Sequence, residues 1–151
     1  MSDDPDDSAD VLLVEDNADD VHRLRDSFAE LNLDISIDVA ADGTDALALL
    51  TDRADDPSSL PDLVLLDLEI PRMNGLELLE AISEDREDQV LERLPILVLT
   101  RSASVEDVSE SYDLAANAYL SKPTDEAGYD ELVTAVADFW FRRAVLPTAA
   151  L

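Results

Sequence analysis

Cysteine is absent from this 151-residue sequence, and no apolar run is long enough to span a membrane. The absence of cysteine excludes a disulfide framework and thiolate chemistry. The first ten residues, MSDDPDDSAD, also lack the basic start and the apolar run of a secretory signal. The sequence therefore predicts a cytoplasmic protein.

Positive charge is scarce: 10 Lys and Arg residues stand against 37 Asp and Glu residues, which gives a formal net charge of −27. Lys122 is the only lysine. A chain of this charge repels nucleic acid and anionic membranes, so neither is an expected partner. Like charges at this density are only partly screened at ordinary ionic strength, which favours a halophilic protein of a high-salt cytoplasm. A moderately acidic mesophilic protein is the alternative.

The length is that of one domain with a core of ordinary size. Hydrophobic residues make up 46% of the chain and recur in short clusters, which is typical of a packed globule and not of a disordered acidic tail. We expect an acidic N-terminal tail at residues 1–9, one folded domain at residues 10–142 and a C-terminal tail at residues 143–151.

Short apolar runs alternate with stretches of helical spacing along the chain. Runs of strand length occur at residues 11–14, 35–40, 63–66, 96–99 and 118–120. Helical spacing predicts helices at residues 21–31, 46–50, 76–82, 105–112 and 129–140. Three of the strands are almost continuously apolar, as in a parallel sheet that is covered on both faces. The repeated βα unit predicts a doubly wound α/β fold with five strands and five helices.

Polar residues follow the predicted strands at the edge where open α/β sheets bind ligands. Glu15 and Asp16 follow the first strand, Asp67 the third, Thr100 the fourth and Lys122 the fifth. Converging carboxylates repel one another and need a cation, and hard oxygen ligands suit Mg²⁺. A lysine in a chain whose other basic residues are arginines indicates a site that needs a compact ammonium. Solvated loop charges are the alternative, because about one residue in four is acidic.

Four segments occur in order at the ends of the predicted strands: VLLVEDN, LVLLDLEIPRMNG, LVLT and AYLSKP. Over residues 10–141 the sequence resembles the receiver domains of response regulators in two-component signalling. The resemblance implies a flavodoxin-like fold, with a five-stranded parallel sheet in the order 2-1-3-4-5, five helices and no output domain. It also implies a phosphorelay in which a sensor histidine kinase is the partner.

The resemblance implies a role for each residue that matches a family motif. Asp67 would accept the phosphoryl group and become an aspartyl phosphate. The domain itself would catalyse this Mg²⁺-dependent reaction and the later, slow hydrolysis of the aspartyl phosphate. The implied Mg²⁺ site consists of Asp16, Asp67 and the backbone carbonyl of Glu69, together with Glu15, which would act mainly through bound water. Lys122 would contact the phosphoryl oxygens, and Thr100 with Tyr119 would form the switch. A cis peptide before Pro123 would aim the lysine.

Two further segments indicate which group of response regulators the sequence resembles. SYDLAANAYLSKPTD and the later DFWFRRAVLP resemble the small regulators that partner phytochrome-type sensor kinases. Such a regulator acts by a conformational switch and protein binding, and a histidine phosphotransfer protein or another downstream protein is its expected target. The aromatic cluster around Trp140, with the fourth helix, fifth strand and fifth helix, predicts a homodimer.

Other functions fit parts of the pattern. A receiver-like interaction module that no longer cycles phosphate would not need the acceptor, metal and lysine set that this sequence retains. A phosphohydrolase of the haloacid dehalogenase type also uses an aspartyl phosphate, but it has an aspartate two residues after the nucleophile, where this sequence has Glu69. A DNA-binding regulator is disfavoured by the surface charge and by the lack of a helix-turn-helix segment after residue 141.

Arg101 replaces the small residue that follows the switch threonine in many receivers. Together with Glu69 it predicts a gate at the mouth of the site that hinders the approach of hydrolytic water. An exposed pair of this kind contributes only about 0–1 kcal/mol to stability, so its effect would be kinetic. The alternative is that Arg101 points into solvent and offsets nearby acidic charge.

Overall fold

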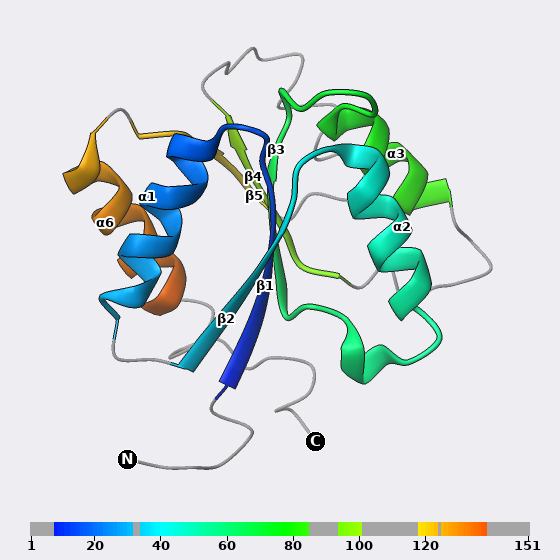
Figure 1. Ribbon diagram of the computed structural model, residues 1–151, viewed down its shortest axis with the longest axis horizontal. Coiled ribbons are helices and arrows are strands. Elements are labelled where there is room, and N and C mark those ends of the chain that lie inside the picture. Colours follow the sequence, from blue (N-terminus) through cyan, green and yellow to red (C-terminus); the bar gives the residue numbers. More distant parts are fainter. Residues whose placement is uncertain (1–7, 32–33, 85–93, 101–117, 124, 139–151) are drawn as a thin grey trace.

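The computed structural model describes residues 8–31, 34–84, 94–100, 118–123 and 125–138 (Figure 1). All the predicted strands are present. They are β1 (Ser8–Val14), β2 (Asp34–Ala40), β3 (Leu63–Asp67), β4 (Ile96–Thr100) and β5 (Ala118–Ser121). β1 begins three residues before the predicted Val11, and the other bounds lie within one residue of the prediction.

Four α-helices lie within the described residues. They are α1 (Ala18–Ala29), α2 (Gly43–Arg53), α3 (Gly75–Glu84) and α6 (Glu126–Ala137), and a short 3-10 helix, η2 (Pro57–Ser59), precedes β3. These helices match the first, second, third and fifth predictions, whereas the predicted helix at 105–112 lies outside the described residues. Within the residues that the structure describes, no helix is both long and apolar enough to cross a membrane.

The strands form one parallel sheet in the predicted order, β2-β1-β3-β4-β5. Val14, at the end of β1, pairs with Ala40 on one side and with Leu66 on the other. Asp67, at the end of β3, pairs with Leu99 of β4. The carboxyl ends of the strands therefore lie along one edge of the sheet, which brings the residues that follow β1, β3 and β5 together.

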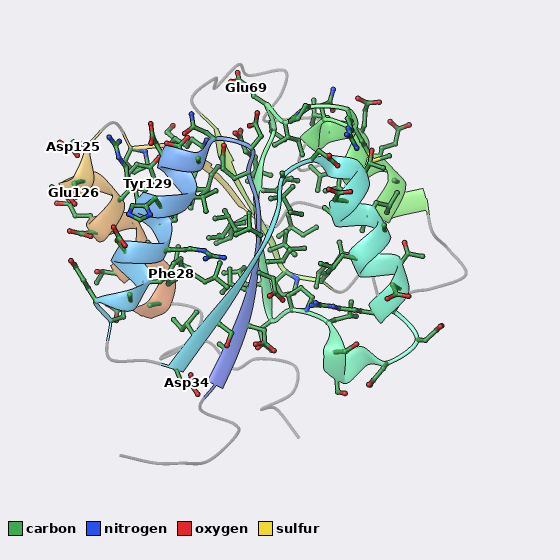
Figure 2. All side chains as sticks on the ribbon, in the orientation of Figure 1. Phe28, Asp34, Glu69, Asp125, Glu126 and Tyr129 are labelled. Atoms are coloured by element: carbon green, nitrogen blue, oxygen red, sulfur yellow. The ribbon has the colours of Figure 1, made fainter. Side chains whose placement is uncertain are left out.

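Helices cover both faces of the sheet, with α1 and α6 on one face and α2 and α3 on the other (Figure 1). Successive strand residues alternate between the two cores, as the pleat requires. Leu12 of β1 belongs to the core under α2 and α3, and Leu13 belongs to the core under α1 and α6. Phe28 of α1 and Tyr129 of α6 pack in that second core (Figure 2). All of β3 is buried, which explains its continuous apolar run.

The turn between β1 and α1 is short and held by two hydrogen bonds. Asn17 caps α1, because its side-chain oxygen accepts a bond of 3.1 Å from the amide of Asp20. The amide of Asn17 donates in turn to Oε1 of Glu15 at 3.1 Å. These bonds fix the backbone that carries Glu15 and Asp16 at the sheet edge.

Candidate functional site

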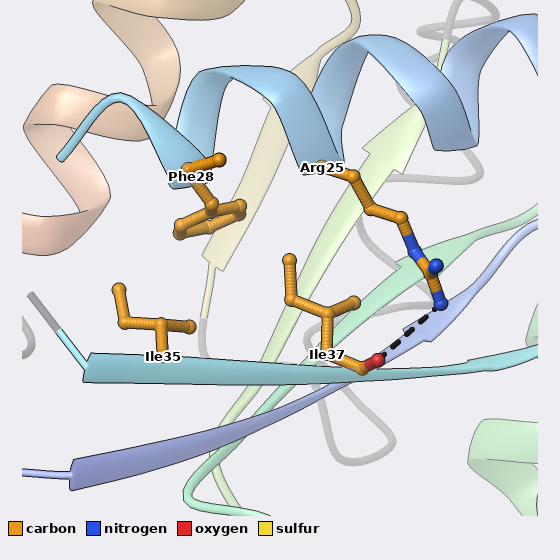
Figure 3. A pocket seen from close by; sticks show the side chains of 5 residues that line it. Arg25, Phe28, Ile35 and Ile37 are labelled. Atoms are coloured by element: carbon orange, nitrogen blue, oxygen red, sulfur yellow. Dashed lines mark hydrogen bonds between the residues drawn. The ribbon is translucent and has the colours of Figure 1, made fainter.

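The surface of the described residues has hollows of different chemical character. One, of about 220 Å³, lies between α1 and β2 and is lined by Arg25, Phe28, Ala29, Ile35 and Ile37 (Figure 3). Its lining is mainly apolar. Another, of about 120 Å³, lies at the carboxyl edge of the sheet and is lined by Glu15, Asp16, Asn17, Asp20, Asp67, Glu69 and Lys122. The ionisable groups are concentrated in this second hollow, which is the candidate site.

Glu15, Asp16 and Asp67 form a compact carboxylate cluster in this hollow. One oxygen from each lies within 4.8 Å of the others, and Glu15 and Asp67 are buried whereas Asp16 is exposed. The backbone amide of Glu69 donates to Oδ1 of Asp67 at 3.0 Å, which fixes the orientation of that carboxylate. Such a set of oxygen ligands, with one open side, suits a hard divalent cation that keeps some of its water. The three residues therefore fit a site for a divalent cation.

Lys122 reaches the cluster from the end of β5. Its Nζ lies 2.5 Å from Oε2 of Glu15, 2.9 Å from Oδ2 of Asp67 and 2.9 Å from Oδ2 of Asp20. An ammonium has three donors, and each faces one of these carboxylates. The lysine side chain is only 4% exposed, so these contacts are shielded from water and salt.

The pKa values of Glu15 and Lys122 are both shifted in the site. Burial raises the pKa of Glu15 to about 7, the nearby charge of Asp67 acts in the same direction, and the hydrogen bond from Lys122 opposes them. Burial alone would lower the pKa of Lys122, but its bonds to Asp20, Glu15 and Asp67 outweigh this effect and raise the pKa above its usual range. Lys122 is therefore a permanent cation near neutral pH, and Glu15 is the group that a divalent cation would have to deprotonate.

Asp20 is a member of the site that the sequence analysis did not include. It lies in the first turn of α1, it is 1% exposed, and its Oδ1 accepts a hydrogen bond of 3.0 Å from the hydroxyl of Tyr129. Its spacing was an available signal: Asp20, Leu24 and Phe28 recur every four residues, and all three are buried. A carboxylate on the apolar stripe of a helix needs a buried partner, which here is Lys122.

The remaining predicted site residues are only partly described. Thr100 ends β4 and pairs with Ser121, and Tyr119 lies on β5, where it pairs with Val98. The side chains of Thr100 and Tyr119 and all of Arg101 lie outside the described residues. The side chain of Glu69 is exposed, as a residue at the rim should be.

The expected cis peptide before Pro123 is wrong for this structure, because no described peptide bond is cis. The position of Lys122 has a different physical basis. The carboxylates of Glu15, Asp20 and Asp67 surround its ammonium and hold it in place. These contacts hold the end of a flexible four-carbon side chain.

The fold and the carboxylate and lysine site together define a receiver domain. The family model described as the response regulator receiver domain matches residues 11–137, and the chain belongs to this family. It is thus a protein of two-component signalling, a class in which an aspartate is the phosphorylated residue. This assignment leaves no support for a dehalogenase-type hydrolase.

Phytochrome-associated regulators are among the similar proteins. The response regulator Rcp1 of Synechocystis is 33% identical over 150 residues, which cover 99% of this chain and 100% of that protein. The crystal structure of the phosphorylated cyanobacterial phytochrome response regulator RcpA matches with 32% identity and a TM-score of 0.81, over 93% of this chain and 99% of that one. The Mn²⁺-bound form of Rcp1 matches with 32% identity and a TM-score of 0.79, over 92% of this chain and 99% of that one.

Proposed function

We propose that this chain is a stand-alone response regulator whose Asp67 accepts a phosphoryl group from the phosphohistidine of a sensor histidine kinase. The observation that carries the proposal is the buried ammonium of Lys122, 2.9 Å from Oδ2 of Asp67, beside two more carboxylates that can hold a cation. Phosphoryl transfer to a carboxylate requires a positioned nucleophile and positive charge near the phosphoryl oxygens, which the ammonium and a bound cation supply.

The chain's residues divide the work of the transfer. A carboxylate oxygen of Asp67 forms a bond to phosphorus while the bond from phosphorus to the kinase histidine breaks, and the histidine nitrogen keeps the electron pair and takes a proton. Lys122 offsets the negative charge of the moving phosphoryl oxygens. Mg²⁺, when bound, supplies further positive charge at those oxygens. Its ligands would be Glu15, Asp16, Asp67 and the backbone carbonyl of Glu69.

The cycle ends when a water oxygen attacks phosphorus and the bond from phosphorus to Asp67 breaks, which releases inorganic phosphate and frees the carboxylate. Phosphorylation would be read out through Thr100 and Tyr119, which lie on the neighbouring strands β4 and β5. The output is protein binding, with a histidine phosphotransfer protein or another downstream protein as target, and a homodimer built on the face around β5 and α6. The likeness to Rcp1 and RcpA supports a phytochrome-type kinase as the donor.

The environment of the protein follows from its charge. We place it in a halophilic cytoplasm, because a formal net charge of −27 is tolerated best where salt screens the surface. The same charge argues against nucleic acid and anionic membrane as partners.

Phosphate incorporation from a radiolabelled small-molecule donor, acetyl phosphate, tests the proposal. The wild-type chain should take up acid-labile, hydroxylamine-sensitive label only with Mg²⁺, and Asp67→Asn should take up none. Asp62→Asn is a matched control. Asp62 lies just before the first residue of β3, at the opposite end of the strand from Asp67, and its carboxylate accepts a hydrogen bond from the amide of Asp10. Full label in Asp67→Asn would overturn the assignment of the acceptor. A folded wild-type chain that takes up no label would favour the non-cycling interaction module.

A further inference from the structure

Asp20 is a buried carboxylate that the phosphoryl-transfer roles proposed above do not use. It is not part of the cation cluster, which consists of Glu15, Asp16 and Asp67. A buried carboxylate is costly unless it is paired and hydrogen-bonded, so its presence on the inner face of α1 calls for a role. Its contacts with Lys122 and Tyr129 indicate what that role is.

Asp20 and Asp67 contact the same ammonium. Both Oδ2 atoms lie 2.9 Å from the Nζ of Lys122. When Asp67 becomes an acyl phosphate, its contact with the lysine must change, because one of its oxygens then carries the phosphoryl group. Asp20 undergoes no such change. The third partner of the ammonium, Glu15, belongs to the cation cluster. Asp20 is thus the one of the three carboxylates that neither accepts the phosphoryl group nor belongs to that cluster.

Tyr129 holds Asp20 in turn. The tyrosine is fully buried on α6, and its hydroxyl donates to Oδ1 of Asp20, the oxygen that does not face the lysine. The guanidinium of Arg23 lies 5.9 Å from the centre of the tyrosine ring. A chain of bonded groups therefore runs from α6 through Asp20 to Lys122 and ends at Asp67.

We propose that Asp20 is a positioning residue for phosphorylation, which holds the Lys122 ammonium beside Asp67, and that the hydroxyl of Tyr129 holds Asp20 for this purpose. The inference rests on the proposed function, because it concerns the rate of the same transfer. An ammonium that is already in place offsets the charge of the phosphoryl group without first having to be ordered.

A positioning role for Asp20 and a purely electrostatic effect of its charge predict opposite changes in the phosphorylation rate of Asp20→Asn. If Asp20 only adds negative charge, its removal should speed the arrival of an anionic phosphodonor and raise the rate. If it positions Lys122, the phosphorylation rate at saturating acetyl phosphate and Mg²⁺ should fall about tenfold, while the donor concentration for half-maximal rate stays the same or falls. Tyr129→Phe, which keeps the ring, should lower the saturating rate less, and the double variant should be no slower than Asp20→Asn.

Ser27→Ala is the matched control. The hydroxyl of Ser27 bonds Oδ1 of Asp130 at 2.6 Å, so this variant also loses a bond between α1 and α6, but one that does not touch Lys122. It should be phosphorylated at the wild-type rate. A loss of rate in Ser27→Ala equal to that in Tyr129→Phe would show that the packing of the two helices is responsible, and would overturn the inference.

A second measurement needs neither metal nor phosphodonor. Because Lys122 is the only lysine, protein made with ¹⁵N-labelled lysine has one labelled ε-ammonium. In the wild-type chain its protons should be protected from exchange and visible by NMR. They should be lost or strongly shifted in Asp20→Asn and weakened in Tyr129→Phe, and they should be unchanged in Ser27→Ala.

The outcomes separate this inference from the function on which it rests. A wild-type chain that takes up no phosphate would overturn both. A wild-type chain that is phosphorylated, with Asp20→Asn equally fast or faster, would overturn the positioning role and leave Asp67 as the acceptor. If Asp20→Asn does not fold, Tyr129→Phe compared with Ser27→Ala decides: equal rates and equal ammonium signals in the two would overturn the role.

Discussion

The amide of Gly75 donates a hydrogen bond of 3.0 Å to the carbonyl of Leu68, which brings the start of α3 against the end of the acceptor strand. A Cβ atom at Gly75 would lie 2.6 Å from Cα of Leu68 and 2.8 Å from the carbonyl oxygen of Asp67. Glycine is therefore required at this position by close approach of two backbones, not by an unusual torsion angle.

Gly75→Ala should lower the free energy of unfolding by about 1–3 kcal/mol, because the added methyl group meets backbone atoms that cannot move aside cheaply. Urea unfolding checks this value. Glu80→Ala, an exposed change on the same helix, should stay within about 0.5 kcal/mol of the wild type. Equal stability of Gly75→Ala and the wild type would mean that α3 can shift away from β3.

Divalent cation affinity should depend on pH through Glu15. Its pKa is raised to about 7 by burial, so the proton and the cation compete for the same carboxylate below that pH. The dissociation constant for Mg²⁺ should therefore be about tenfold weaker at pH 6 than at pH 8. Calorimetric titration at the two pH values measures it. Glu15→Gln should bind more weakly throughout and lose most of this pH dependence, and a wild-type affinity equal at both values would contradict the prediction.

The stability of the metal-free protein should respond to the same group with a defined sign. Because the pKa of Glu15 is raised from 4.5 to about 7 in the folded state, the folded state holds the proton more tightly. The stability that this provides is fully present below pH 4.5 and is lost as the pH rises through 7. Thermal unfolding of the wild type and Glu15→Gln between pH 5 and pH 8 should show a steeper decline for the wild type. Parallel curves would contradict this.

Lys122→Arg should fold but be phosphorylated at least about tenfold more slowly, because a planar guanidinium cannot place one compact donor among three carboxylates in the same space. Label uptake from acetyl phosphate measures the rate. Arg53→Lys is the matched exchange at an exposed ion pair with Asp38, and it should have no effect. A normal rate in Lys122→Arg would show that the kind of cation at this position is unimportant.

Added salt should stabilise the protein. Molar KCl screens the repulsion of a chain with a formal net charge of −27 and should raise the melting temperature by roughly 4–8 °C, which corresponds to about 2 kcal/mol for a domain of this size. Sucrose at the same osmolality serves as a control for general solute effects. A melting temperature that does not change with KCl would remove the argument for a halophilic protein.

The gate formed by Arg101 and Glu69 remains a prediction. If the pair hinders hydrolytic water, Arg101→Ala and Glu69→Ala should each speed loss of the acyl phosphate, and the double variant should add little more. Dephosphorylation rates at fixed salt measure this. Unchanged lifetimes in all three variants would leave Arg101 as a solvent-exposed charge.

The pattern of apolar residues was sufficient to predict the sheet, because buried parallel strands consist of almost continuous apolar runs. The run at Leu63 to Leu66 is apolar throughout, and the strand is buried on both faces as expected. β1 was placed too late because Ser8 and Asp10 interrupt its apolar run. Strand pairing with β2 includes these residues regardless, since Ser8 pairs with Asp34 and Asp10 with Ser36. Backbone pairing with β2, and not side-chain hydrophobicity, therefore determines where β1 begins.

The grouping of Glu15, Asp67 and Lys122 could be predicted because each follows a strand and parallel strands end at the same edge. Asp20 could not be predicted by that reasoning, because it comes from a helix and its partner Tyr129 is 109 residues away. An acidic residue at the start of a helix is ordinarily explained by the helix dipole and solvent. The four-residue spacing of Asp20 with the buried Leu24 and Phe28 was the signal in the sequence, and the packing of α1 against α6 shows which partners the buried carboxylate has.

The burial of Lys122 also determines how the protein responds to amine-directed reagents. The side chain of this sole lysine is 4% exposed, so the surface offers no ε-amine to acylating cross-linkers or to enzymes that modify lysine. Any acetyl group found at Lys122 would report opening of the site, because the amine must leave its carboxylates before it can react. Acylation with a small ester is consequently a direct chemical measure of how often the phosphorylation site opens to solvent.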